Sequence, residues 1–327
     1  DSSTSRGLGD VYKRQGYFHS SNNMIECSNV WRKENREVHK FLRAIGFSDI
    51  TKKDLEMILD EVITRPEIMK ITKDSEGNEF AELSGSFAAN AGITVRGTYQ
   101  EDDSFHMDYY YPYVFGTSIT TNEQIDVEKH AEKESYAGVC DEVNLGVTLI
   151  FYIQNVADYL AETNRHLSKI HYGAMLAGLS TEGKILCPVV ERKKNDVPAI
   201  QKNDRHNQLI AQAREGDEDA IESLTLEDMD TYALLSQRVM KEDIFSIVKS
   251  TFMPFGIESD QYTVLGEIID CVTMENKLTH EKLYGMKLLC NNIQFDVCIN
   301  EKDLLGEPAI GRRFRGNVWM QGNLCLE

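Results

Sequence analysis

Apolar and polar positions alternate with two different periods along this chain, and the period indicates which segments are helices and which are strands. From about Lys52 to Thr64 the apolar residues recur at helical spacing. Thr51 precedes this run as an N-cap with the carboxylate of Asp54 three residues on, and Pro66 follows it as a stop. The sequence therefore predicts a helix here that covers a sheet.

Between residues 68 and 190 the pattern favours strands joined by polar turns. The predicted strands are Ile68–Thr72, Phe80–Leu83, Ile93–Tyr99, Phe105–Phe115, Ile125–Gly138, Leu145–Ile153 and Lys184–Val190, with a helix over Val156–His166. The first four strands form two hairpins. Pro112 has no N–H to donate, so its strand lies at a sheet edge or a bulge.

A polar segment, Glu191–Asp204, separates these strands from a helical pattern that runs from Arg205 to Ser250. From Tyr262 to Leu326 the chain returns to strand-like patterning with glycine punctuation, and Ile293–Ile299 alternates cleanly between apolar and polar residues. About five short strands predict a small closed barrel of the oligonucleotide/oligosaccharide-binding type.

The predicted fold class is α+β. Residues 38–190 form a mixed or antiparallel sheet domain with covering helices, 191–260 a linker and helical connector, and 261–327 a small β-barrel.

Residues 1–37 are expected to be non-native sequence. Ser5–Gln15 is what a sequencing-library adapter encodes in one frame, as in a metagenomic sequence, and Trp31–Glu37 can be encoded by a purine run like a ribosome-binding site. Translation is expected to start at Val38, with Met24 as the alternative.

The formal net charge is −18, and it becomes −19 without residues 1–37, which carry six basic and five acidic residues. This charge repels phosphate backbones and anionic lipid, which disfavours general nucleic-acid binding and membrane-surface binding. No apolar run approaches the length of a membrane span. The seven cysteines show no CxxC spacing and are typical of a reducing, cytoplasmic compartment.

The common catalytic motifs are not found in the sequence. It has no P-loop, no GxGxxG after a strand, no GxSxG and no HExxH, and no cofactor is predicted. Cys140 is followed by Asp141 and Glu142, whose charges raise rather than lower a thiol pKa, so a nucleophile is not expected there. The tyrosines of 109–113 could line a sugar or peptide groove, although aromatic strand residues usually pack within a sheet.

One candidate site is an acidic row. If residues 126–134 form one strand, the side chains of Asp126, Glu128, His130, Glu132 and Glu134 share a face. Glu128, His130 and Glu132 could then help to hold a divalent cation. The alternative is a solvated strand face whose charge is offset by neighbouring lysines.

A second candidate is the face on which Arg313, Arg315, Asn317, Trp319 and Gln321 alternate with apolar residues. Residues 261–327 carry seven basic and nine acidic side chains, so this is the least acidic part of the chain. Arg313, Arg315 and Trp319 could anchor a protein partner or stack on a base. Alternatively, Trp319 packs against the neighbouring domain and the arginines pair with its acids.

Several long stretches are similar to an uncharacterised family of clostridial bacterial proteins, the domain of unknown function numbered 3881. These stretches are HKFLRAIGFS from His39, KHAEKESYAGVCDE from Lys129, GVTLIFYIQN from Gly146, AREGDEDAIESLTLEDMDTY from Ala213 and FDVCINEKDLLGEPAIGRRFRGNVWMQG from Phe295. The resemblance implies a bacterial cytoplasmic protein and carries no known activity or catalytic residue.

These observations favour a non-catalytic binding or adaptor protein that recognises a protein partner through Arg313, Arg315 and Trp319. A metal-dependent enzyme that uses the acidic row is one alternative. Single-stranded nucleic-acid binding by the barrel is another, and the acidic charge argues against it.

Overall fold

The computed structural model of the chain describes residues 38–102, 104–129, 134–164, 173–188, 212, 248–255 and 260–326. Most of the predicted helical connector and all of residues 1–37 lie outside the described residues. The described part is mostly β. Its helices are α3 (Lys52–Thr64), α4 (Val156–Asn164) and the short 3-10 helices η1 (Lys40–Ile45) and η2 (Glu301–Asp303).

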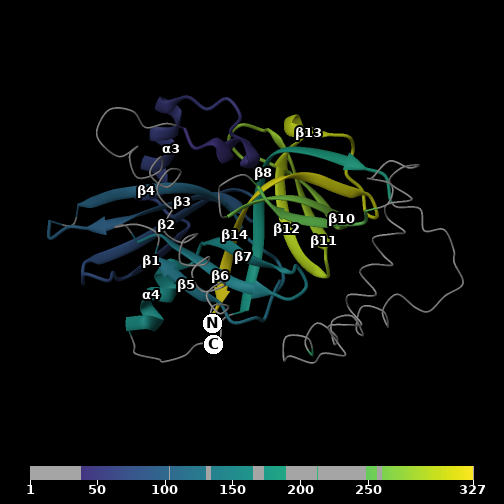
Figure 1. Cartoon of the computed structure of the whole chain (residues 1–327). Coiled ribbons are helices and arrows are strands. Elements are labelled where there is room, and N and C mark those ends of the chain that lie inside the picture. The colour runs from purple at the N-terminus through teal and green to yellow at the C-terminus, as the bar shows by residue number, and fades with distance from the viewer. Residues whose placement is uncertain are drawn as a thin grey trace, which may run out of the picture.

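Helix α3 has the predicted span. Its N-cap is Thr51, whose Oγ1 accepts the backbone N–H of Asp54 at 3.2 Å, while the same hydroxyl donates to the Asp54 carboxylate. Leu55, Leu59 and Val62 are the buried side chains of this helix. They pack on strands β2 and β3 of a four-stranded sheet, so α3 covers a sheet as the sequence predicts (Figure 1).

That sheet is antiparallel, with strand order β1-β2-β3-β4. Its strands are β1 (Ile68–Lys73), β2 (Glu79–Ala88), β3 (Ala91–Tyr99) and β4 (Phe105–Val114). Both predicted hairpins are present, because consecutive strands pair throughout. Pro112 lies in β4, which is an edge strand, as its missing N–H requires.

A second, larger sheet contains the remaining strands and curls into a closed barrel (Figure 1). These strands are β5 (Asp126–Lys129), β6 (Tyr136–Glu142), β7 (Val147–Ile153), β8 (Gly173–Leu186), β9 (Thr251–Pro254), β10 (Gln261–Glu275), β11 (Lys282–Cys290), β12 (Ile293–Asn300), β13 (Leu304–Leu305) and β14 (Arg313–Cys325).

The barrel has five strands, in the order β8-β12-β11-β10-β14, and it closes because β14 also pairs with β8. Strands β10, β11 and β12 are joined by consecutive hairpins, and β14 returns to pair with β10, which is a Greek key. Strand β8 fills the gap between β14 and β12. Four strands of the barrel therefore come from residues 261–326, and the fifth, β8, precedes the predicted connector in the sequence.

Strand β8 is longer than the sequence indicates, since the predicted strand Lys184–Val190 overlaps only its last three residues. The first half of β8 is rich in small residues, which weakens the strand signal. Their size is required by packing: a Cβ on Gly178 would lie 2.0 Å from the Val318 side chain in β14.

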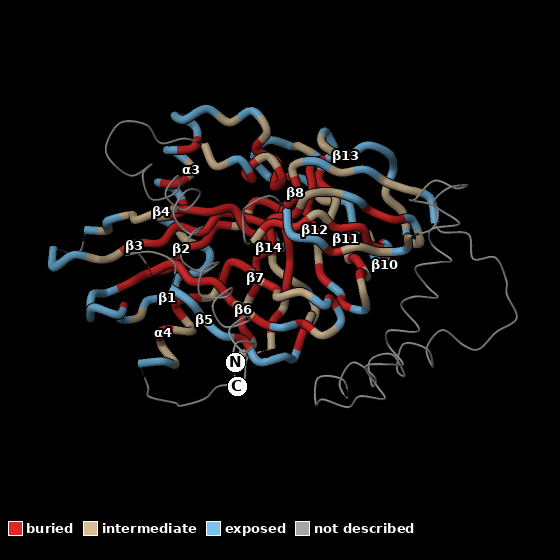
Figure 2. The backbone as a smooth tube through the Cα atoms, in the orientation of Figure 1, coloured by how far each residue is buried: buried red, intermediate tan, exposed pale blue. Residues whose placement is uncertain are grey.

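The predicted strand Ile125–Gly138 is also corrected. Strand β5 ends at Lys129 and pairs antiparallel with β6, which begins at Tyr136, so the segment folds back on itself. Two apolar cores result. One fills the barrel and continues beneath β6, β7 and α4, and the other lies between α3, the four-stranded sheet, η1 and the outer face of the barrel (Figure 2).

Candidate functional site

The outward row of β14 is divided between buried and exposed positions. Trp319 lies under residues 39–49, which we call the N-terminal segment. Its ring stacks on Phe41 at 5.1 Å between centroids and lies 5.2 Å from the ring of His39. Its indole Nε1 donates to the carboxylate of Asp260 at 2.7 Å. Only 7% of Trp319 is exposed. The intramolecular packing named as the alternative for Trp319 accounts for all of these contacts.

The two arginines of this row have different surroundings. Arg313 is buried, and its guanidinium donates to the carbonyl oxygens of Cys187 at 2.9 Å and Val248 at 2.6 Å. Burial lowers the pKa of Arg313. Arg315 is exposed on the same strand. The structure thus does not present Arg313, Arg315 and Trp319 together on one open surface.

The acidic row is not carried on one strand. Asp126 and Glu128 are exposed on β5, whereas His130 and Glu132 lie outside the described residues. Glu134, which lies two residues before β6, is buried and accepts hydrogen bonds from Lys129 Nζ at 2.8 Å and Ser75 Oγ at 2.6 Å, and one from Tyr136. Across the described ranges, no group of three His, Cys, Asp or Glu side chains is placed to hold a metal ion.

Burial raises the pKa of Cys140 to about 12, and nearby acidic side chains contribute to the increase. Its thiol therefore stays protonated. In the ranges that the structure describes, no helix is long and apolar enough to cross a membrane.

Two tyrosines of β4, Tyr109 and Tyr111, belong to a buried ionic network that the sequence does not reveal. Arg96 of β3 is fully buried and donates to the Glu82 carboxylate at 2.7 Å. It also donates to the hydroxyls of Tyr109 at 2.9 Å, Tyr111 at 3.2 Å and Tyr152 at 2.8 Å, and to the carbonyls of Ile153 and Gln154. We call this set the Arg96 network.

The Arg96 network joins the two sheets. Glu82 and Arg96 belong to the four-stranded sheet, whereas Tyr152 belongs to β7 of the larger sheet. The second oxygen of Glu82 accepts the N–H of Ala157 in the first turn of α4 at 2.9 Å. Burial would lower the pKa of Arg96, but the three tyrosines and Glu82 raise it, so the guanidinium keeps its charge. Its contacts are internal, and we assign the network a structural role.

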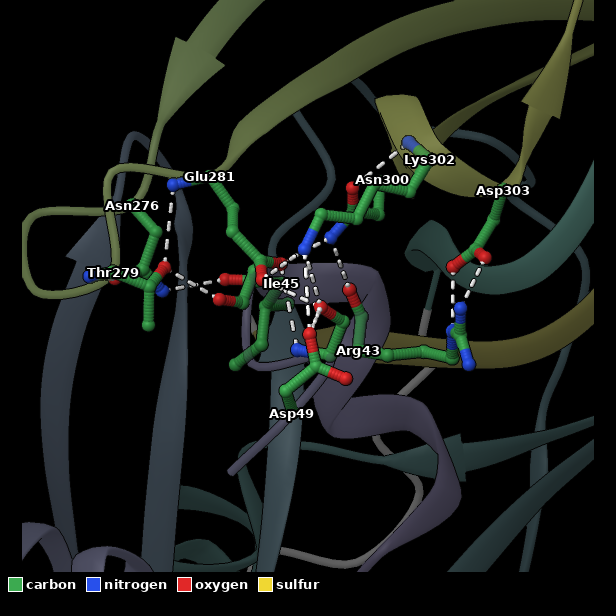
Figure 3. Close-up of polar contacts among 11 residues, drawn as sticks. Arg43, Ile45, Asp49, Asn276, Thr279, Glu281, Asn300, Lys302 and Asp303 are labelled. Carbon is green, nitrogen blue, oxygen red and sulfur yellow. Dashed lines mark hydrogen bonds and ion pairs between the residues drawn. The ribbon is translucent and has the colours of Figure 1, made fainter. Parts of the chain in front are cut away.

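A second polar set holds the N-terminal segment, residues 39–49, against the barrel (Figure 3). Three barrel side chains each donate to a backbone carbonyl of this segment. Asn300 Nδ2 reaches Arg43 O at 3.1 Å, Asn276 Nδ2 reaches Ile45 O at 2.7 Å, and Thr279 Oγ1 reaches Gly46 O at 2.6 Å. We call these contacts, together with the charged pairs below, the N-terminal clamp.

Charged groups complete the N-terminal clamp. Arg43 makes a two-pronged pair with Asp303, with distances of 2.7 and 2.5 Å (Figure 3). Glu281 accepts hydrogen bonds from Ser48, Lys302 and Asn300. Burial would raise the pKa of Glu281, but these donors hold it below its usual value. The clamp thus recognises both the backbone and the charge of the segment.

The apolar side of the N-terminal segment packs between the outer face of the barrel and β4, and we call the surface that it covers the groove. Phe41, Leu42, Ala44 and Ile45 are buried there. His39, at the start of η1, packs among aromatic rings, and its backbone N–H donates to the Tyr110 hydroxyl at 3.0 Å. The pKa of His39 falls to about 4, mainly because of burial and also because of Lys40, so its ring is neutral.

A third candidate is the outer edge of the four-stranded sheet. Strand β1 pairs only with β2 in the part of the chain that the structure describes. It carries three of the exposed large apolar side chains, Ile68 at 41%, Met69 at 49% and Ile71 at 50%. On one face, Lys70 pairs with Asp158 of α4 at 2.6 Å. On the other face, Met69 and Ile71 are half exposed.

The described residues thus form a mostly β protein in which a five-stranded barrel that contains a Greek key lies against a four-stranded sheet. The chain belongs to the family described as "Domain of unknown function, E. rectale Gene description (DUF3881)", whose model matches residues 42–322. No curated protein and no solved structure matches the chain.

Proposed function

We propose that this protein is a non-catalytic binding protein that recognises an extended segment of a protein partner along strand β1. One observation carries the proposal: an edge strand without a second partner strand, among the described residues, holds three exposed apolar side chains. Natural proteins usually protect such edges, because an open edge strand pairs with other chains. Strand addition to a sheet edge is a common mode of peptide recognition.

The side chains of β1 support this mode. Met69 and Ile71 are register partners of Leu83 and Ala81 in β2, and paired residues share a face of the sheet. Leu83 and Ala81 are fully buried in the core that α3 helps to form. The apolar face of the sheet therefore continues past its covered part. A strand added at β1 would cover Met69 and Ile71 with its own apolar residues.

The charge around β1 favours a partner segment that also carries acidic residues. The chain as a whole is strongly acidic, but β1 contributes Lys73 and follows Arg65, while its Lys70 already pairs with Asp158. Arg65 and Lys73 are exposed. Opposite charges across an interface raise the association rate and fix the register of pairing.

The cysteines support a cytoplasmic setting for this interaction. All six that the structure describes are free, and burial raises the pKa values of Cys290 and Cys298 to about 12.

A synthetic peptide tests the proposal. A fluorescently labelled peptide of about six residues, the usual length of a strand, alternates valine and glutamate. We expect its anisotropy to rise saturably with the full chain. The double substitution Met69→Asp and Ile71→Asp should weaken binding by about tenfold or more, since it places charge on the contacting face that also repels the glutamates of the peptide. A matched variant, Ile310→Asp, changes an apolar residue that is 70% exposed elsewhere and should bind normally.

Two further outcomes decide the matter. A peptide with a central proline lacks one backbone donor and should not bind, because strand addition depends on main-chain hydrogen bonds. Equal binding to all three proteins would contradict the proposal, as would no binding at all. A concentration-dependent doubling of mass that Met69→Asp and Ile71→Asp abolish would instead assign the edge to a second copy of the chain.

A further inference from the structure

We propose that the groove that holds residues 39–48 is a peptide-binding site. The chain's own N-terminal segment fills this groove in cis, and the groove also accepts a peptide of the same chemistry from another molecule. The groove lies between the outer face of the barrel and β4 and is distinct from the β1 edge. The ligand class is a short peptide that carries an aromatic residue, a cation two residues later and a glycine turn.

The first argument is the way in which the segment is held. Side chains of Asn300, Asn276 and Thr279 donate to the carbonyls of residues 43, 45 and 46 (Figure 3). Asn276 and Thr279 lie in the loop that follows β10, and Asn300 is the last residue of β12, so all three donors are more than 200 residues away in sequence. Amide and hydroxyl groups that bind the backbone of a separate segment recognise its conformation whatever its side chains. In ligand sites, a small number of polar groups placed in this way fixes the orientation of the ligand.

The second argument is side-chain selection. The Arg43 guanidinium meets the Asp303 carboxylate with two hydrogen bonds, and a planar two-pronged pair is specific for arginine. The side chain of Asp303 is only 7% exposed, whereas that of Arg43 is 43% exposed. The acid therefore belongs to the wall of the groove, and the arginine reaches it from outside. Phe41 stacks on Trp319 as an aromatic anchor.

The third argument is that the segment is joined to the following helix by a short, accessible turn. Gly46 has a φ of 93°, which allows the chain to reverse after η1. Ser48 and Asp49 form the turn that follows, and Asp49 is exposed. A cut between Asp49 and Ile50 would leave every clamp contact of residues 39–48 in place and would turn the segment into a separate peptide.

The experiment starts from the full chain, with a protease recognition sequence inserted between Asp49 and Ile50. After the protein has folded, the protease is added, and a labelled synthetic peptide of residues 38–49 is supplied in excess. We expect the label to exchange into the groove and the anisotropy to rise to a plateau. An Arg43→Asp peptide should bind at least about tenfold more weakly, because it places like charges together.

Exchanging the charges of Arg43 and Asp303 distinguishes specific recognition of the arginine from nonspecific binding of the peptide. The Arg43→Asp peptide should regain affinity for cut protein that carries Asp303→Arg. A Lys40→Asp peptide has the same net charge as the Arg43→Asp peptide, and it should bind the original protein clearly better than the Arg43→Asp peptide does, since it keeps the pair between Arg43 and Asp303. Precipitation of the cut protein when the peptide leaves would overturn the proposal, because the segment would then be an inseparable part of the core. Failure of the labelled peptide to exchange would overturn it as well.

Discussion

The Arg96 network and the N-terminal clamp both tie distant parts of the chain together with charged hydrogen bonds, yet their surroundings are opposite. Arg96 is fully buried and Glu82 is only 4% exposed, and every partner around them is internal. In the charged pairs of the clamp, the side chains of Arg43 and Lys302 are 43% and 53% exposed, whereas their acidic partners Asp303 and Glu281 are mostly buried. Charged hydrogen bonds therefore occur both in a setting shielded from water, the Arg96 network, and in one that water reaches, the N-terminal clamp; we call these settings dry and wet.

This difference predicts unequal contributions to the free energy of unfolding. A buried charge that loses its partner cannot recover its hydration, so the loss is large, about 3–5 kcal/mol. A half-exposed pair is screened by water and salt, and it contributes at most about 1 kcal/mol. The dry network fixes the fold, whereas the wet clamp sets how a segment is held.

The largest effect is expected for Arg96→Met. The variant leaves Glu82 buried without its cation and three tyrosine hydroxyls without their donor, so it should lower the free energy of unfolding by about 3–5 kcal/mol. Urea unfolding followed by circular dichroism measures this change. The double variant Arg96→Met, Glu82→Gln removes the unpaired charge and should recover about 1–2 kcal/mol of it. A single variant as stable as the original protein would break the comparison.

The next effect concerns the turn inside the clamp. Gly46→Ala introduces a Cβ at a φ of 93°, and that atom would lie 2.6 Å from the Asn276 side chain, which must move. Left-handed strain and the displaced Asn276 together should cost about 2–3 kcal/mol. Thermal unfolding measures the loss. Gly77→Ala is the control for strain alone, because Gly77 also has a φ of 93° but nothing lies within 4 Å of its Cβ position. Equal losses in both variants would remove Asn276 from the explanation.

A third test uses pH. His39 has a folded pKa of about 4, below the usual 6.5, so between these values the unfolded chain binds a proton that the folded chain does not. Stability should therefore fall as the pH drops from about 6.5 to about 4, by about 2 kcal/mol after allowance for the partial exposure of the ring. His39→Asn keeps a polar acceptor that does not titrate, so its stability should change less over this window. Parallel pH curves for the two proteins would contradict the assignment.

The smallest effect is expected for Asp303→Asn, which removes the charge of the pair with Arg43 and keeps the shape. Because Arg43 is 43% exposed, the loss should not exceed about 1 kcal/mol, and it should shrink as salt is added. Chemical denaturation at low and high ionic strength measures both quantities. A loss comparable to that of Arg96→Met would show that the clamp behaves as a dry network.

Local patterns predicted the local structure well. The N-cap at Thr51 and the apolar spacing after it fix α3 to the residue, and the hairpins of β1 to β4 follow from alternation and turn chemistry. The barrel was expected as well, but the position of β8 could not be predicted. Its pairing with β14 joins segments far apart in sequence, and its small residues are explained only by the side chains of that distant strand. Whether the barrel is related to the oligonucleotide/oligosaccharide-binding type stays a prediction.

The candidate sites show the same limit. Alternation placed Arg313, Arg315 and Trp319 correctly on the outward side of β14, but it could not show that the N-terminal segment covers Trp319. Arg96 alternates with apolar residues in β3 and looks like a solvent-facing position. It is buried because β7, more than 50 residues later, covers that face of the sheet. The β1 segment was visible as an apolar strand, and only the topology shows that it pairs with β2 alone among the described residues.

The pairing of β8 with β14 also sets an order of events during synthesis. Ala177 and Gln321 are partners in this ladder, so a ribosome must make the intervening chain before the two strands can meet. Contacts between residues so far apart in sequence form slowly, and the exposed strands are open to misassembly in the meantime. The four-stranded sheet, built from neighbouring hairpins, can form long before. We therefore expect the nascent chain to carry a finished sheet beside an open barrel until its last strand is made.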